Sequence, residues 1–133
     1  MKETKKILIL LNHIPAPEQL EDIEKQLNAK IETEADLKIK EMWSNIPPVM
    51  DKISLYLEPV KKWILKNSNE SDFIWVQGES GALFNIVNFC LKNKRKPIYS
   101  VTKRNLEKEI KEENQIKTTR IFKHVKFRFY EAE

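Results

Sequence analysis

Both glycines of this chain, Gly78 and Gly81, fall in one turn between a predicted strand and a predicted helix. The apolar residues 73–77 before them have strand character, and residues 82–92 after them are apolar at helical spacing. Glycine permits a positive φ or close approach of a ligand to the backbone, and N–H groups at a helix start suit a phosphate. The alternative is a tight connection without a ligand, since the full dinucleotide fingerprint is absent.

The bulk properties limit the class of protein. A chain of 133 residues fits a single domain, here expected over residues 1–133. The net charge of +4 is compatible with a small anionic ligand or RNA. The single cysteine, Cys90, lies on the apolar side of its helix and is interpreted as core. The apolar run at residues 7–11 is too short for a signal peptide or a membrane span, so we expect a cytoplasmic protein without a membrane partner.

Strand and helix patterns alternate along the chain. The first predicted helix begins at Pro17. Three more are predicted over residues 49–66, with an interruption near Pro59, over residues 82–92 and over residues 104–111. The predicted strands cover residues 7–11, 36–41, 73–77, 97–102 and 117–130. The last of these has two mixed faces, which is typical of an edge strand. This order predicts an α/β, Rossmann-like, mostly parallel sheet flanked by helices, with the edge strand at the C-terminus.

Polar side chains gather where three predicted strands end. Ligands of doubly wound sheets bind outside the carboxyl ends of the strands, where the strand order reverses. The candidates are Asn12, His13, Gln77, Gly78, Glu79, Ser80, Gly81, Ser100, Thr102, Lys103 and Arg104, with His124 and Arg128 from the last strand. Amides, hydroxyls and cations of this kind bind phosphates and ribose hydroxyls. The sequence has no metal-binding motif and no Walker motif, so neither a metal nor another cofactor is expected.

Each candidate also has a simpler interpretation. In this interpretation His13 would only cap a loop, and His124 would pack against neighbours or face solvent in an edge strand. Gln77 satisfies backbone groups of its turn, and Glu79 complements the dipole of the following helix. Arg104 and Arg128 face solvent. The sequence leaves these alternatives open.

Seven short stretches, in order along nearly the whole chain, match a known family. They are residues 10–13 (LLNH) with 17–20 (PEQL), 43–48 (WSNIPP), 76–82 (VQGESGA), 87–90 (VNFC), 97–102 (PIYSVT) and 122–128 (FKHVKFR). On these stretches the chain resembles a small CRISPR-associated family of type III systems, the Csx-twenty family of single-domain ring nucleases. The resemblance implies a CARF-like domain, a homodimer, cyclic tetraadenylate as ligand and no DNA partner.

The implied reaction is linearisation of the cyclic ligand, which would switch off an antiviral signal. No metal is needed, because a ribose 2′-hydroxyl attacks the neighbouring phosphorus. Under this interpretation His13, Gln77 and His124 are the expected catalytic residues, since imidazole moves protons near neutral pH. The other candidates would hold the ligand. Two alternatives stay open: a module that binds the cyclic nucleotide without cleaving it, and an unrelated small doubly wound domain.

Overall fold

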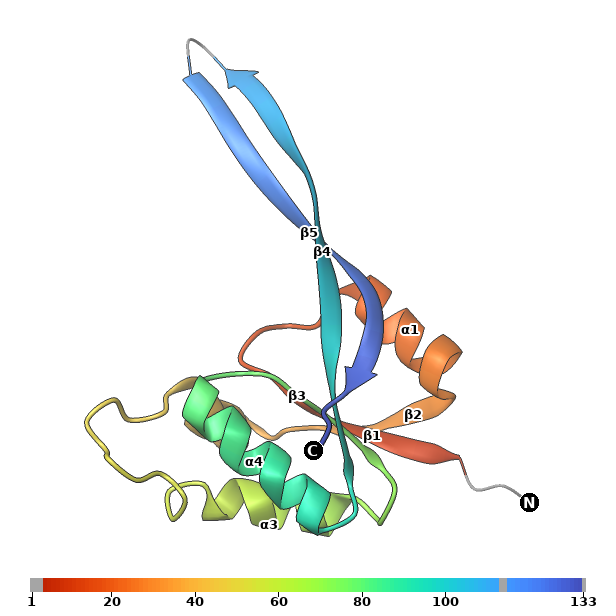
Figure 1. The fold of residues 1–133 in the computed structure, drawn as a ribbon, viewed down its shortest axis with the longest axis vertical. Coiled ribbons are helices and arrows are strands. Elements are labelled where there is room, and N and C mark those ends of the chain that lie inside the picture. The colour runs from red at the N-terminus through yellow and green to blue at the C-terminus, as the bar shows by residue number, and fades with distance from the viewer. Residues whose placement is uncertain (1–3, 113–114, 133) are drawn as a thin grey trace.

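The fold is a five-stranded sheet between two layers of helices, with a long hairpin at one edge (Figure 1). The computed structural model describes residues 4–112 and 115–132, and for residues 32–34, 105–112 and 115–121 it describes the backbone alone. The strands are β1 (Lys5–Leu10), β2 (Ala29–Glu34), β3 (Phe73–Val76), β4 (Lys96–Glu112) and β5 (Gln115–Phe129). The helices are α1 (Pro17–Leu27), α2 (Leu37–Ser44), α3 (Glu58–Asn67) and α4 (Ser80–Lys92).

The sheet has the order β2-β1-β3-β4-β5. The pairs β1–β2, β1–β3 and β3–β4 are parallel, and β4–β5 is antiparallel. The predicted mostly parallel sheet and its C-terminal edge strand are therefore confirmed. From β1 the chain adds β2 on one side and β3 on the other, so the strand order reverses between β1 and β3.

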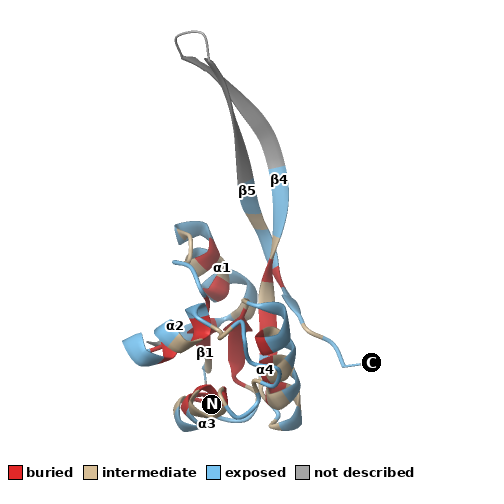
Figure 2. Cartoon of the chain, turned by 90° about the vertical axis from the view of Figure 1, so that its left-hand side faces the viewer, coloured by how far each residue is buried: buried red, intermediate tan, exposed pale blue. Residues whose placement is uncertain are grey.

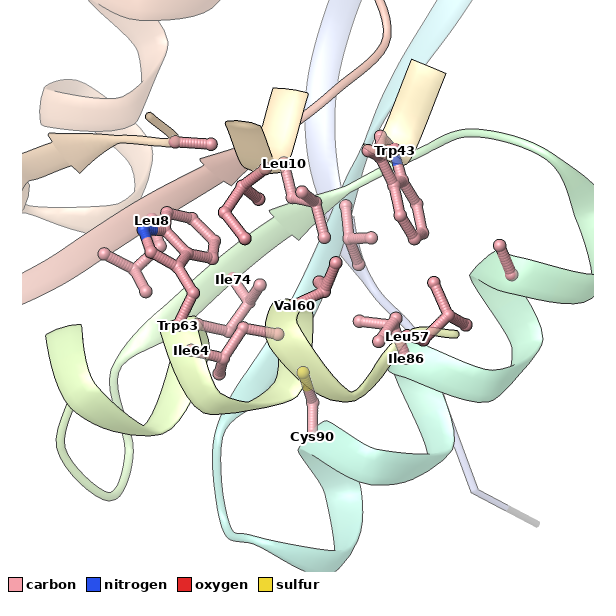
Figure 3. Packing of buried hydrophobic residues seen from close by; sticks show 14 residues of the cluster. Leu8, Leu10, Trp43, Leu57, Val60, Trp63, Ile64, Ile74, Ile86 and Cys90 are labelled. Carbon is pink, nitrogen blue, oxygen red and sulfur yellow. The ribbon is translucent and has the colours of Figure 1, made fainter. Parts of the chain in front are cut away.

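The continuous apolar run of β1 is explained by burial on both faces. Ile7 and Ile9 join a cluster with Ile23 of α1, whereas Leu8 and Leu10 join the larger cluster on the opposite face. In that larger cluster the sheet packs against α2, α3 and α4, and Figure 3 shows Trp43 at one end of it and Cys90 near the other. A single helix, α1, thus covers one face and three cover the other.

Residues 36–41 are not the predicted strand. They begin α2, where the Asp36 carboxylate accepts a hydrogen bond from the Ile39 N–H at 2.9 Å and caps the helix. Ile39 and Trp43, four residues apart, then point together into the core. The second strand is β2, which lies earlier in the chain. The predicted helix over residues 49–66 is also shorter, because the chain turns before Glu58 and Pro59 occupies the first turn of α3.

The predicted helix over residues 104–111 is likewise wrong. These residues continue β4, which pairs with β5 as far as Glu112↔Gln115. The charged sequence has no strong strand pattern, but hydrogen bonding to β5 stabilises an extended backbone whatever the local propensity. The result is a two-stranded arm that projects from the sheet (Figures 1 and 2).

The exposed edge of β5 is covered by polar side chains of α1. The Gln26 amide binds the backbone of Phe127 twice, accepting from its N–H at 2.7 Å and donating to its carbonyl at 2.8 Å. Glu18 accepts from the His124 N–H at 3.2 Å. These contacts satisfy backbone groups that an edge strand otherwise offers to another chain.

Candidate functional site

The three strand ends named from the sequence lie at the same edge of the sheet. Leu10 of β1 pairs with Val76 of β3, and Trp75 pairs with Ile98 of β4. Continuing this register past the strand ends, Asn12, Gly78 and Val101 lie at nearly the same level along the strand direction. Because the strand order reverses between β1 and β3, this edge is where a ligand of a doubly wound sheet is expected.

Two hollows open at this edge, and residues of α2 line both of them. The larger, here called the β1 hollow, has a volume of about 440 Å³ and is lined by Ile9, Leu11, Asn12, His13, Ile14, Pro15, Lys40 and Ser44. The smaller, here called the Trp43 hollow, has a volume of about 340 Å³ and is lined by Asn12, Trp43, Ser44, Asn45, Ile46, Pro48 and Glu79. Asn12 and Ser44 line both.

The β1 hollow combines an imidazole, an amide, a hydroxyl and an ammonium group. His13 is exposed, and its Nδ1 lies 3.4 Å from Oδ1 of Asn12. Lys40 and Ser44, four residues apart on α2, supply the facing wall. This set offers hydrogen bonds and positive charge to an anionic ligand and one group able to accept or release a proton.

At the glycine turn, the backbone N–H groups expected to bind a phosphate are already bonded to a side chain of the protein. The Glu79 carboxylate accepts hydrogen bonds from the N–H groups of Gly81 at 2.8 Å and Ala82 at 3.0 Å, at the start of α4. These two bonds lower the pKa of Glu79. A phosphate would have to displace this carboxylate before it reached the same N–H groups.

The glycines are explained by packing rather than by φ. Neither adopts a positive φ. A Cβ on Gly78 would lie 2.7 Å from Nε1 of Trp43, so only glycine lets the buried indole lie against the turn. Nε1 of Trp43 donates to the Gln77 carbonyl at 2.9 Å. The close approach that the sequence indicated at Gly78 is therefore made by Trp43.

His124 and Ser100 belong to a buried row of hydrogen bonds on the α1 side of the sheet. Gln19 donates to Oγ of Ser100 at 3.1 Å, Oγ lies 2.5 Å from Nδ1 of His124, and Nε2 lies 2.8 Å from Oδ2 of Asp22. Because Gln19 also accepts from the Ala16 N–H, its amide nitrogen must face Ser100. When the imidazole is neutral with its proton on Nε2, the Ser100 hydroxyl donates to Nδ1 and Nε2 donates to Asp22.

This row resembles a serine–histidine–carboxylate triad but lacks access. Ser100 is 6% exposed, and the His124 side chain is 4% exposed beneath α1. The row fastens α1 to β4 and β5, and neither residue lines the β1 hollow or the Trp43 hollow.

Gln77 holds the sheet together at the same height. Its side-chain oxygen accepts from Nε1 of Trp75 at 2.9 Å and from the Ser100 N–H at 2.8 Å. Its backbone N–H donates to Leu10 at 3.3 Å. These contacts agree with the simpler interpretation of Gln77, in which it satisfies polar groups near its turn.

The remaining candidates lie outside both hollows. Thr102, Lys103 and Arg104 are exposed on the arm, and Arg128 donates to the hydroxyl of Tyr99 at 3.2 Å. Ser80 and Gly81 are exposed at the start of α4. The structure thus brings Asn12, His13 and Glu79 to the hollows and separates the other predicted residues from them.

Sequence reasoning missed Lys40 and Ser44, because the helix that carries them, α2, was not predicted and residues 36–41 were expected to be a strand. The four-residue spacing of Ile39 and Trp43 after Asp36 was the available signal. It also missed Gln19 and Asp22, for which the signal was a polar stripe on α1 that continues to Gln26 at helical spacing.

Two further observations describe the parts of the chain that the structure resolves in detail. Burial raises the pKa of the Cys90 thiol to about 12, as expected for a core residue. Within the described residues, no cluster of three His, Cys, Asp or Glu side chains has the arrangement of a metal site, and no helix has the length and apolarity of a membrane span.

Comparison with known proteins gives a family without an assigned activity. Residues 5–128 match the model described as the uncharacterized protein MJ1673 family. Uncharacterized protein MJ1673 of Methanocaldococcus jannaschii is 38% identical over 125 residues, which cover 94% of this chain and 96% of that protein. No solved structure matches the chain. The extent of both matches shows that the chain belongs to the MJ1673 family.

Proposed function

We propose that the protein is a metal-independent ring nuclease that binds cyclic tetraadenylate at the β1 hollow and opens the ring. The observation that carries the proposal is the position of His13, Asn12, Lys40 and Ser44 around one hollow at the edge where the strand order reverses. The resemblance of the sequence to CRISPR-associated ring nucleases of type III systems supports the choice of ligand. The product would no longer act as an antiviral second messenger.

Ring opening needs only an internal transfer of the phosphodiester bond. A ribose 2′-oxygen forms a bond to the adjacent phosphorus, and the bond from phosphorus to the 5′-oxygen breaks. The products are a 2′,3′-cyclic phosphate and a 5′-hydroxyl, so no water is consumed. The proton lost by the 2′-hydroxyl is returned to the leaving 5′-oxygen. In this proposal His13 handles the proton, and Lys40 stabilises charge on the phosphoryl oxygens.

The ligand is expected to meet two copies of the hollow in a homodimer, because a cyclic tetranucleotide has pseudo-symmetry. Ile14 is 90% exposed at the hollow, and Leu37 is 71% exposed at the start of α2. Such side chains support a contact between copies at this edge. Sedimentation of the wild type and of Ile14→Glu tests the dimer, and a wild type that is monomeric at all concentrations would contradict it.

Cleavage is tested by incubating cyclic tetraadenylate with the protein in EDTA and separating the products by chromatography. We expect linear products with a cyclic phosphate end. His13→Ala and Lys40→Ala should each reduce turnover by about 100-fold, which is the lower end of the range for a lost acid–base group. Lys38→Ala is the matched control, since Lys38 is an exposed lysine of the same helix that does not line the hollow.

A binding module without cleavage is the second candidate. It is favoured by one observation: His124 is buried, which leaves His13 as the only histidine at the hollows. Titration calorimetry separates the two functions. Binding that His13→Ala and Lys40→Ala weaken, with intact ligand after long incubation at excess protein, would select the binding module. Absence of both binding and cleavage would reject both.

A further inference from the structure

The two strands of the arm, β4 and β5, carry the net positive charge of the chain. Residues 96–130 contain ten Lys or Arg and four Asp or Glu, a net charge of +6, whereas the whole chain has +4. The rest of the molecule is therefore net negative. A charge separation of this kind raises the local concentration of a polyanion at the arm.

Four cations near the sheet lie on one face of the two strands. Side chains of paired residues in antiparallel strands share a face, and successive residues alternate. The pairs Tyr99↔Arg128, Val101↔Lys126 and Lys103↔Lys123 therefore present one face, with a bulge after Val101 that keeps the cations in line. The four cations are exposed and form what we call the cationic row: Lys103, Lys123, Lys126 and Arg128.

The cationic row is not explained by stability. Lys103 lies directly opposite Lys123, and like charges in such a pair destabilise a sheet. Arg128 lies over the Tyr99 ring, with Cζ 5.9 Å from the ring centroid, so the aromatic ring positions this guanidinium on the face of the row. The row lines neither the β1 hollow nor the Trp43 hollow.

We propose that the cationic row binds the phosphodiester backbone of a nucleic acid. A two-stranded ribbon has the width to enter the major groove of a duplex, and exposed Lys and Arg contact phosphates without regard to sequence. An anionic membrane is less well matched. Phe122 is exposed on the opposite face, where Arg104 stacks on it with Cζ 5.8 Å from the ring centroid, so this aromatic side chain does not stand beside the row for insertion into a bilayer. This inference does not depend on the proposed ring nuclease activity.

The test is fluorescence anisotropy of the full chain with labelled 30-nucleotide RNA and DNA, each single-stranded and double-stranded, between 50 and 200 mM NaCl. Four phosphate contacts give a slope of about −3 in a plot of log affinity against log salt, which corresponds to about 60-fold weaker binding at the higher salt. The relative affinities of the four probes show whether RNA or DNA is preferred, and either preference supports the row as the contact surface.

The decisive comparison is between two double variants that each remove two positive charges, one pair from the cationic row and one pair from α3. Lys103→Gln with Lys123→Gln should weaken binding at least 10-fold and reduce the salt slope by about half, because two of four contacts are lost. Lys62→Gln with Lys66→Gln, two exposed lysines of α3, is the control and should leave both values unchanged. Circular dichroism checks that each variant is folded. Equal weakening by both double variants, no salt-dependent binding to any probe, or binding only to phosphatidylserine vesicles would overturn the proposal.

Discussion

The two histidines of the chain stand in opposite kinds of polar surroundings. The side chain of His124, in β5, is buried in a row of hydrogen bonds, where its two ring nitrogens bond to Ser100 and Asp22 and Gln19 bonds to Ser100. His13, after β1, is exposed beside the β1 hollow and has one weak contact to Asn12 at 3.4 Å. Both regions lie at the same end of the sheet and look alike in sequence. A polar group that is fully satisfied inside the protein stabilises the fold, whereas one at an open hollow remains available to a ligand.

The largest expected effect is on the buried side of this comparison. His124→Ala should lower the free energy of unfolding by about 3–4 kcal/mol, because it leaves a cavity against Phe127 and removes the partners of Ser100 and Asp22. Urea unfolding monitored by circular dichroism measures the change. A loss below about 1 kcal/mol, within the range for an exposed side chain, would mean that the row is not a structural element.

Gly78→Ala tests whether the packing of Trp43 fixes the turn between β3 and α4. The new Cβ would lie 2.7–2.9 Å from three atoms of the buried indole, so we expect a loss of about 3 kcal/mol from overpacking. Gly81→Ala is the matched control. Its Cβ would lie at ordinary contact distance from the Glu79 carboxylate, at 3.4 Å, and from Cδ1 of Ile53, at 3.7 Å. Because its helical position favours alanine, stability should change by less than about 1 kcal/mol. Equal effects at the two glycines would contradict the packing explanation.

Gln77→Ala should have an intermediate effect. It removes the acceptor of the Trp75 indole and of the Ser100 N–H, and unfolding should be easier by about 2 kcal/mol. Gln77→Glu retains an acceptor oxygen and should be less destabilising than Gln77→Ala. If Gln77→Ala instead kept full stability and lost ligand binding, Gln77 would belong with His13 as part of the ligand site.

The sequence predicted the sheet well because its signals are long and repetitive. The apolar runs of β1 and β3 and the helical spacing of α4 follow from burial on fixed faces. The same signals failed for residues 36–41 and 104–111, where packing of Trp43 and pairing with β5 decide the structure. The pairing with β5 leaves no local pattern in residues 104–111, and for α2 the spacing of Ile39 and Trp43 after Asp36 is the local signal.

The candidate site was predicted in part for a similar reason. The parallel sheet brings Asn12, His13 and Glu79 to one edge, as the order of the strands indicates. Which polar side chains form hydrogen bonds within the protein, and are therefore not open to a ligand, depends on partners that are distant in the sequence. Asp22 and His124 are 102 residues apart, and Gln19 and Ser100 are 81 apart. Neither pair is visible in the sequence alone.

On the open side of the comparison, His13→Ala should barely affect folding. The side chain is exposed, so the free energy of unfolding should change by no more than about 0.5 kcal/mol. The same variant should lose ring-opening activity if the proposed function holds. A large loss of stability would show that His13, like His124, is structural, and it would remove the basis of the comparison.

The smallest effect is expected from Glu79, and it depends on pH. Its pKa is lowered by the N–H groups of Gly81 and then Ala82, so the folded protein holds this carboxyl ionised more strongly than the unfolded chain does. The resulting stabilisation is fully present above 4.5, the ordinary pKa of a glutamate carboxyl, and is lost as the pH falls below that value through the folded pKa. Glu79→Gln should therefore lower the melting temperature slightly at pH 7, and the difference from wild type should shrink on acidification below pH 4.5. Because Glu79 is exposed at the Trp43 hollow, added phosphate directly tests whether the N–H groups that its carboxylate binds can also bind an anion. If phosphate raised the melting temperature of Glu79→Gln but not of wild type, the N–H groups at this turn would be a site for anions that the protein's own carboxylate normally occupies.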